Sequence, residues 1–114
     1  MTIGVDIEEI SRFKGKSKDF IERIFTKYEI EYCSKFKNPE SHYAARFCAK
    51  EAVIKALTPF GIHIAEYNLI EVLKDENNCP KIKILKDLDK NIDIEVSLSH
   101  DKTKAIAFVT AQIK

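Results

Sequence analysis

The sequence predicts an α+β domain in which a mostly antiparallel sheet packs on one central helix. Residues 46–57 contain no Gly or Pro, are rich in Ala and run to about three turns, which is typical of a globular helix. Residues 92–98 alternate apolar and polar side chains, which is the pattern of a half-buried strand. Apolar runs at residues 2–7 and 105–111 predict two further strands.

The strand at residues 2–7 is followed by a helical region at residues 18–36, where apolar residues recur every three to four positions. Thr26 and Glu29 match a capping box, so this region is either one helix or two short ones. Residues 37–41 are expected to form a loop in which Pro39 prevents the helix from continuing. Ser41 or its neighbour is expected to cap the central helix.

Two hairpins are expected after the central helix, which should end at Pro59 and Gly61. Residues 67–73 and 81–85 predict the first hairpin, around a polar turn at residues 75–80. The strands at residues 92–98 and 105–111 predict the second, with His100 at its tip. Few helices cover this sheet of three or four strands, so we expect a homo-oligomer to bury the remaining apolar surface.

Length and composition indicate one globular domain over residues 1–114. Hydrophobic residues make up 45% and charged residues 32%, which excludes disordered and fibrous classes. No apolar run approaches the roughly 20 residues of a membrane span, and the first residues lack the pattern of a signal peptide. Cys33, Cys48 and Cys79 lack disulfide or zinc-ligand spacing and are expected to be reduced thiols in the cytoplasm.

A basic run stands out early in a chain whose net charge is only +1. It consists of Arg12, Lys14, Lys16 and Lys18. Such a run is usually a solvated surface segment, and the functional alternative is the docking of an acidic protein. A net charge near zero makes nucleic acid an unexpected partner.

Glu51 and Lys55 lie one turn apart among apolar residues of the central helix. Such a pair is commonly a surface ion pair. Among apolar neighbours, however, these charges need each other, a metal or a charged ligand. Asp6 lies near the end of the first strand, with Glu8 on the same face, so Asp6 either ends the strand or caps the following turn, or it belongs to a metal or phosphate site.

Four blocks of sequence, in this order, resemble the holo-[acyl carrier protein] synthase group of the 4′-phosphopantetheinyl transferase family. The blocks are Ile3-Gly4-Val5-Asp6-Ile7-Glu8, Glu22-Arg23-Ile24-Phe25-Thr26-x-x-Glu29, Arg46-Phe47-x-Ala49-Lys50-Glu51-Ala52-x-x-Lys55-Ala56 and Ser97-Leu98-Ser99-His100-Asp101. The third block is the most specific, and the resemblance covers essentially the whole chain.

The resemblance implies transfer of 4′-phosphopantetheine from coenzyme A to a serine of apo-acyl carrier protein in fatty acid biosynthesis, with release of adenosine 3′,5′-bisphosphate. Asp6 and Glu51 match the family's Mg²⁺ ligands, and Lys55 matches the lysine near the pyrophosphate. His100 matches the histidine beside the coenzyme, and the alternative for this residue is a turn histidine in solvent. Arg12 and its basic neighbours match the region that docks the carrier protein. The family's small members are homotrimers with active sites between subunits.

Asp6, Glu51 and Lys55 are therefore the predicted catalytic residues, and the serine proton passes either to Glu51 or to a metal-bound water. Lys50 and Arg46 are expected to hold phosphates, or Arg46 to serve a neighbouring subunit. Two turns depart from the pattern of the family. The family's glycine-rich turn after the central helix has only one glycine here, in residues 58–63, and its Asn-Gly turn in the first hairpin is replaced by residues 77–80. The alternative function is a non-catalytic oligomeric module that binds an acidic protein.

Overall fold

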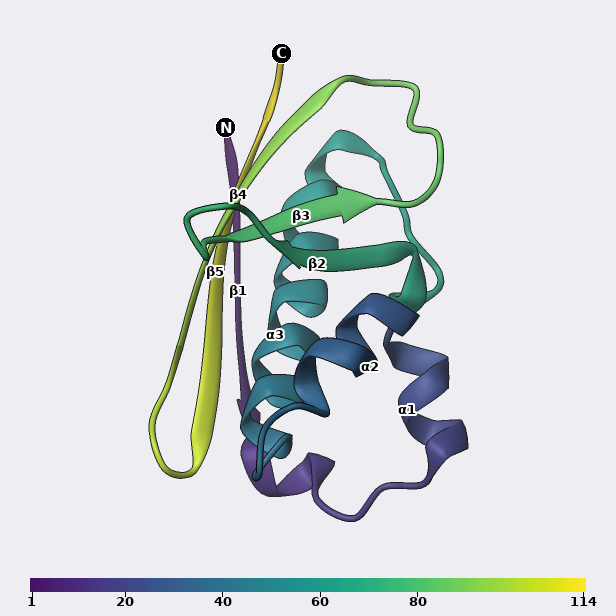
Figure 1. Cartoon of the computed structure of the whole chain (residues 1–114). Coiled ribbons are helices and arrows are strands. Elements are labelled where there is room, and N and C mark those ends of the chain that lie inside the picture. Colours follow the sequence, from purple (N-terminus) through teal and green to yellow (C-terminus); the bar gives the residue numbers. More distant parts are fainter.

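The long helix α3 (Glu40–Leu57) lies between two antiparallel sheets in the computed structural model, which describes residues 1–114 (Figure 1). The larger sheet has the order β1 (Thr2–Glu9), β5 (Lys104–Ile113), β4 (Ile92–His100). The smaller sheet pairs β2 (Ile70–Lys74) with β3 (Pro80–Ile84). Two short helices, α1 (Lys18–Ile24) and α2 (Lys27–Cys33), lie on the side of α3 away from the larger sheet (Figure 1).

The α+β class and the antiparallel pairing are confirmed, but the single sheet of three or four strands is wrong. The first hairpin forms a sheet of its own because it has to cover the other side of α3. Ile70 and Val72 of β2 are buried there, against α2 and α3. Residues 67–69 form a 3₁₀ turn before β2 rather than part of the strand.

The helical region divides into two short helices at Thr26. The Thr26 hydroxyl accepts a hydrogen bond from the Glu29 N–H, and the Glu29 carboxylate accepts one from the Thr26 N–H, which completes the capping box. Helix α3 begins at Glu40 after Pro39, whose φ of −70° already suits a helix. The expected cap at Ser41 or its neighbour is wrong, because no side chain caps this end.

Both predicted hairpin turns are present. Asn78 adopts a φ of 62°, which asparagine tolerates better than most residues, and the Asp75 carboxylate accepts hydrogen bonds from two N–H groups of the turn. His100 is the last residue of β4, and the Asp101 carboxylate accepts from the N–H groups of Thr103 and Lys104, both at 2.8 Å. Gly61, with a φ of 75°, ends the short 3₁₀ turn after α3, as predicted.

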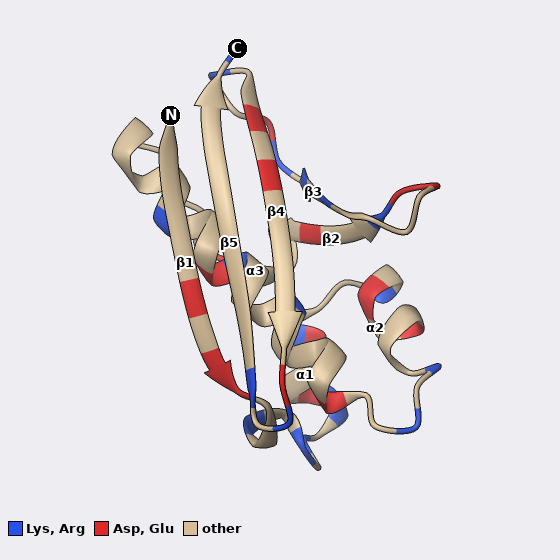
Figure 2. Ribbon diagram, turned by 90° about the vertical axis from the view of Figure 1, so that its left-hand side faces the viewer, with Lys and Arg blue, Asp and Glu red and all other residues tan.

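Apolar side chains surround α3, and every residue from Tyr43 to Lys50 is buried. The outer face of the larger sheet, which Figure 2 views directly, also carries exposed apolar residues. They are Ile3, Val5 and Ile7 on β1 and Ile106 and Phe108 on β5. None of the helices has the length and apolar character that crossing a membrane requires.

Candidate functional site

Strand β1 lies directly on the backbone of α3. A Cβ atom added to Gly4 would stand 2.0 Å from the carbonyl oxygen of Ala52. Nearby, the Thr2 hydroxyl donates to the carbonyl oxygen of Ala56 at 2.6 Å. The alanines of α3 permit this approach, as their small size predicts. Because side chains alternate along a strand, the face of β1 that turns Gly4 to the helix also turns Asp6 and Glu8 toward it.

Lys55 joins the helix to the strand. Its ammonium donates to the carbonyl oxygen of Val5 at 2.9 Å and to Asp6 Oδ1 at 3.4 Å. The ion-pair partner of Lys55 is thus Asp6 and not Glu51, so the surface-pair explanation does not describe this lysine. Glu51 lies one helical turn before Lys55 on the same helix, so Asp6 and Glu51 are both neighbours of this lysine.

The Asp6 carboxylate is only half satisfied. Its Oδ2 atom is buried and has no hydrogen-bond partner in the chain. Glu8 lies beside it: burial is the main cause that raises the pKa of Glu8, and the hydrogen bond and negative charge of Asp6 raise it further. Arg12 opposes these effects through a 2.8 Å ion pair with Glu8. Two crowded carboxylates with an unpaired oxygen favour a cation at this place.

Glu51 is held by a tyrosine. The hydroxyl of Tyr67 donates to Glu51 Oε1 at 2.5 Å. This hydrogen bond to Glu51 is the main cause that raises the pKa of Tyr67 to about 12, and burial adds to it. The charges of Arg12 and Glu8 also act on Tyr67, so the Tyr67 hydroxyl lies near Glu8 as well as Glu51.

The donor set fits Mg²⁺ bound together with a phosphate ligand. No group of three or more His, Cys, Asp or Glu side chains converges to hold a metal ion by itself. Mg²⁺ is commonly held by one or two carboxylates, with water and substrate phosphates completing its shell. The unpaired oxygen of Asp6 and the carboxylate of Glu51 suit that kind of site.

Lys50 does not reach this site. Its ammonium is fully buried and has three acceptors, namely Glu29 Oε1 at 2.8 Å and the carbonyl oxygens of Tyr67 at 3.0 Å and Ile70 at 2.6 Å. All three N–H donors are therefore used inside the chain. This corrects the prediction of a phosphate contact for Lys50, because helix α3 turns that side chain toward α2 and β2.

Arg46 is also engaged inside the chain. Only 4% of the residue is exposed, and its guanidinium lies 4.3 Å from the centre of the Tyr32 ring and donates to the carbonyl oxygen of His42. The pKa of His42 is lowered, first by burial and then by the positive charges of Arg46, His100 and Lys74. Arg46 thus contributes positive charge near His42, whose ring centre lies 6.4 Å from that of His100, and has little surface for a direct phosphate contact.

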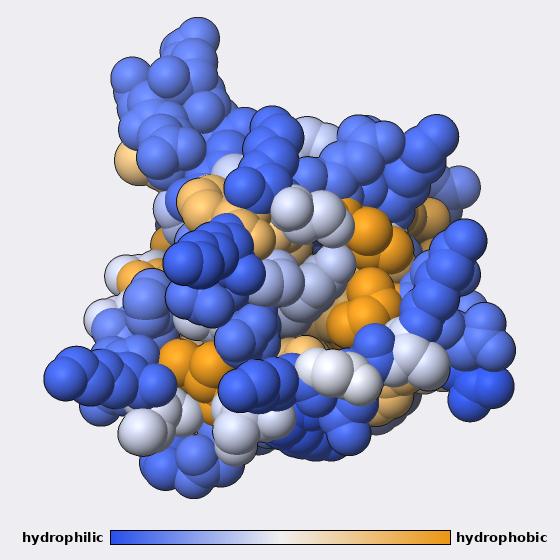
Figure 3. All heavy atoms as spheres, turned by 60° about the horizontal axis from the view of Figure 1, so that its bottom comes forward, coloured by the Kyte–Doolittle hydropathy of each residue, from blue (hydrophilic) through white to orange (hydrophobic).

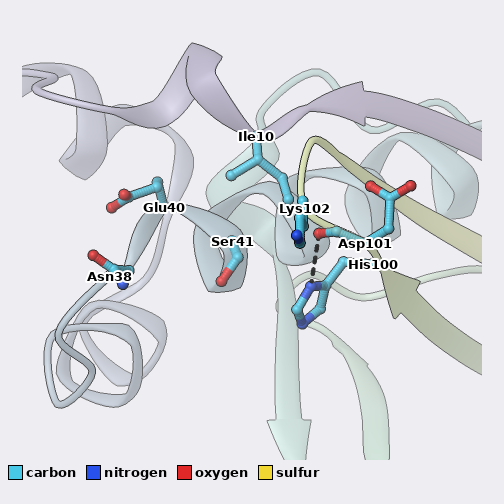
Figure 4. Close-up of a pocket in the computed structure, with 7 residues that line it drawn as sticks. All are labelled: Ile10, Asn38, Glu40, Ser41, His100, Asp101 and Lys102. Carbon is cyan, nitrogen blue, oxygen red and sulfur yellow. Dashed lines mark hydrogen bonds between the residues drawn. The ribbon is translucent and has the colours of Figure 1, made fainter.

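His100 borders a cavity of about 560 Å³ at the end of the molecule where α3 begins (Figure 4). The lining residues come from three segments: Ile10 after β1, residues Asn38, Glu40 and Ser41 at the start of α3, and His100, Asp101 and Lys102 at the β4–β5 turn. His100 Nδ1 donates to the carbonyl oxygen of Asp101 at 3.3 Å. Figure 3 views this end and shows hydrophobic patches in a hollowed surface bordered by hydrophilic side chains.

The basic run divides between Arg12, which lies beside the carboxylates, and three exposed lysines. Arg12 pairs with Glu8, and its guanidinium lies 5.1 Å from the centre of the Phe47 ring, so it borders the carboxylate group. Lys14, Lys16 and Lys18 are exposed in the segment that leads into α1. The sequence prediction thus placed Arg12 with the lysines, whereas the structure places it with Glu8.

The contacts of Tyr67 with Glu51 and of Glu29 with Lys50 do not follow from the sequence patterns. The sequence pattern predicts a strand at Tyr67, and no periodicity predicts its contact with Glu51, sixteen positions earlier. Glu29 was identified only as a capping residue, although it also pairs with Lys50. A long-range contact of this kind has no signal in local periodicity.

Comparison with known proteins decides the family. Residues 2–110 match the sequence profile of the 4′-phosphopantetheinyl transferase superfamily. The chain belongs to this superfamily. A holo-[acyl-carrier-protein] synthase of Caldicellulosiruptor saccharolyticus is 38% identical over 96% of this chain and 94% of its own length.

Solved structures of superfamily members agree with this assignment. The Helicobacter pylori holo-[acyl-carrier-protein] synthase in complex with coenzyme A is 33% identical, with a TM-score of 0.78 over 96% of this chain and 99% of that one. An ACPS-CoA complex from Chronobacterium ammoniagenes has a TM-score of 0.85 over 99% and 97% of the two chains. Because its identity is only 24%, this second structure supports the fold of the present chain alone.

Proposed function

We propose that this chain transfers the 4′-phosphopantetheine group of coenzyme A to a serine of an apo-acyl carrier protein. The observation that carries the proposal is the contact of Lys55 with Asp6, whose other oxygen is unpaired, one turn after Glu51 on α3. Membership of the superfamily and the named synthases among its relatives support the same reaction. The carrier's serine oxygen bonds to the phosphorus that bears pantetheine, the bond to the bridging oxygen breaks, and adenosine 3′,5′-bisphosphate leaves.

Asp6 and Glu51 would hold Mg²⁺ in this proposal, through the unpaired Oδ2 of Asp6 and the carboxylate of Glu51. The ion supplies positive charge against the negative charge that develops on the diphosphate. Lys55 adds a second positive charge, because its ammonium lies beside Asp6 on a half-exposed side chain and keeps a third N–H donor for a phosphate. Glu51 is also placed to accept the serine proton, since its other oxygen is not engaged by Tyr67.

The cavity at His100 would take an anionic part of the coenzyme. Lys102 lines this cavity, and Arg46 and Lys74 add positive charge near His42, whose ring centre lies 6.4 Å from that of His100. The cavity includes Ile10, which lies four residues after Asp6, on the order of 13 Å along an extended chain. An elongated ligand such as coenzyme A would reach from the carboxylate of Asp6 to the cavity at His100. The exposed lysines between Arg12 and Lys18 would dock the acidic carrier protein.

A homotrimer with active sites between subunits is part of the proposal. Strand β1 is an edge strand whose outer face is apolar and whose inner face carries Asp6 and Glu8. A second copy that packs on the outer face and extends around the open edge of β1 would border the carboxylates. A cytoplasmic location also remains a prediction, and the three free thiols agree with it.

The test is mass spectrometry of an apo-acyl carrier protein incubated with the purified protein, coenzyme A and Mg²⁺. The carrier is expected to gain the mass of one phosphopantetheine group, and Glu51→Gln is expected to abolish the gain while keeping the thermal midpoint. Binding of carrier without any mass change, over several carriers, would instead favour the non-catalytic module. Full activity in Glu51→Gln would remove the metal from the proposed reaction.

A further inference from the structure

Tyr67 connects the buried centre of the domain to the carboxylate of Glu51. Its hydroxyl donates to Glu51 Oε1 at 2.5 Å, and its ring packs on Phe47 with the ring centres 5.0 Å apart. Its backbone carbonyl oxygen accepts a hydrogen bond from the ammonium of Lys50 at 3.0 Å. Two consecutive residues of α3 therefore hold one tyrosine, Lys50 at its backbone and Glu51 at its hydroxyl.

The anchor of this tyrosine is a fully buried ion pair. Lys50 and Glu29 lie 2.8 Å apart, and neither side chain has any exposed surface. The Glu29 carboxylate is itself fixed, since it accepts from the N–H groups of Thr26 at 2.8 Å and Val72 at 2.7 Å. Helix α2, helix α3 and strand β2 are joined at this point. The backbone of Tyr67 is thus tied to a part of the chain that water does not enter.

We infer that Tyr67 is a positioning residue for Glu51, an inference that rests on the proposed function. A carboxylate has two oxygens and turns freely about its last bond. The hydrogen bond from Tyr67 engages Oε1, and this sets the direction in which the other oxygen points. Carboxylates that bind metals are commonly oriented by such a neighbouring donor, and the loss of the donor weakens metal binding. Tyr67 acts through Glu51 and has no contact with substrate in this role.

The variant Tyr67→Phe tests this role, because it removes the hydroxyl and keeps the ring on Phe47. Binding of Mn²⁺ as a probe is measured by electron paramagnetic resonance with coenzyme A present and no carrier protein. We expect the Mn²⁺ affinity to fall about 10-fold to 100-fold. The thermal midpoint and the KM for coenzyme A should change little. Tyr28→Phe is the matched control, since Tyr28 lies exposed on α2, and it should behave as wild type.

The outcomes separate the inference from the proposed function. Wild-type Mn²⁺ affinity and turnover in Tyr67→Phe would overturn the positioning role and leave the proposed reaction intact. A lower thermal midpoint with unchanged Mn²⁺ affinity would assign Tyr67 to packing alone and overturn the inference as well. A wild-type protein that neither binds Mn²⁺ nor modifies the carrier would overturn the proposed function, and the inference with it.

Discussion

Gly4 lies so close to Ala52 that the backbones of β1 and α3 are in direct contact at this point. A Cβ atom at Gly4 would meet the Ala52 carbonyl oxygen at 2.0 Å and the Ala56 nitrogen at 3.0 Å. The contact is between backbone atoms, which cannot rotate away as a flexible side chain could. This approach is what brings Asp6 to Lys55, so the glycine supports both the fold and the candidate site.

Gly4→Ala is expected to destabilise the protein by about 3 kcal/mol, because strand and helix must separate to admit the methyl group. The free energy of unfolding is measured by urea denaturation. Gly15→Ala is the control: Gly15 has a φ of 66° but nothing within 4 Å, so it tests backbone strain without a clash. It should cost about 1 kcal/mol. Equal losses at the two glycines would argue against the close contact at Gly4.

Lys55→Met is expected to lower turnover about a hundredfold while the fold is kept, because it removes the positive charge beside Asp6. Steady-state kinetics with coenzyme A and a carrier protein measure the effect, and circular dichroism checks the fold. Lys83→Met is the control, since Lys83 is exposed on β3. Retention of full activity in Lys55→Met would exclude this lysine from the reaction.

The site shows which contacts local sequence patterns can predict. The alternation in β4 and the Thr26 capping box depend on neighbours in sequence, so the hairpin and the division of the first helical region were predictable. The roles of Asp6, Glu51 and Lys55 came from a resemblance, and the structure adds the contact of Asp6 with Lys55.

The errors have a common physical origin in long-range contacts. Lys50 and Lys55 both lie among apolar residues of α3, yet one side chain is fully buried and the other is exposed. Only the position of α2 and β2 relative to α3 decides this, because they supply Glu29 and the carbonyl oxygens that satisfy Lys50. The separate sheet of β2 and β3 and the hydrogen bond of Tyr67 to Glu51 follow from the same packing.

The buried thiols predict a loss of stability in alkali. Burial is the main cause that raises the pKa of Cys33 and of Cys48 from 9.0 to about 12. Between about pH 9 and pH 12, each thiol therefore stays protonated in the folded protein and loses its proton in the unfolded chain. Their contribution to stability is complete below about pH 9 and is lost as the pH rises toward 12, at up to about 1.4 kcal/mol per pH unit for each thiol.

Urea unfolding between about pH 9 and pH 11, with a reducing agent present, measures this slope. Cys33→Ala should give a smaller slope than wild type, whatever its effect on stability at neutral pH. Cys79→Ala is the matched control, because Cys79 is exposed, and its slope should equal that of wild type. Identical slopes for all three proteins would show that burial does not perturb the Cys33 thiol.

The apolar outer face of the larger sheet predicts where copies of the chain associate. Val5 of β1 lies opposite Phe108 of β5 in the register of the sheet, and both are about half exposed. Phe108→Asp should therefore prevent assembly by placing a charge in the centre of this face, while the monomer keeps its fold. Size-exclusion chromatography with light scattering measures the mass in solution. Leu85→Asp is the control, since Leu85 is an exposed apolar residue outside this sheet. If Phe108→Asp assembles as wild type does, the subunits meet elsewhere, and an active site bordered by this face is excluded.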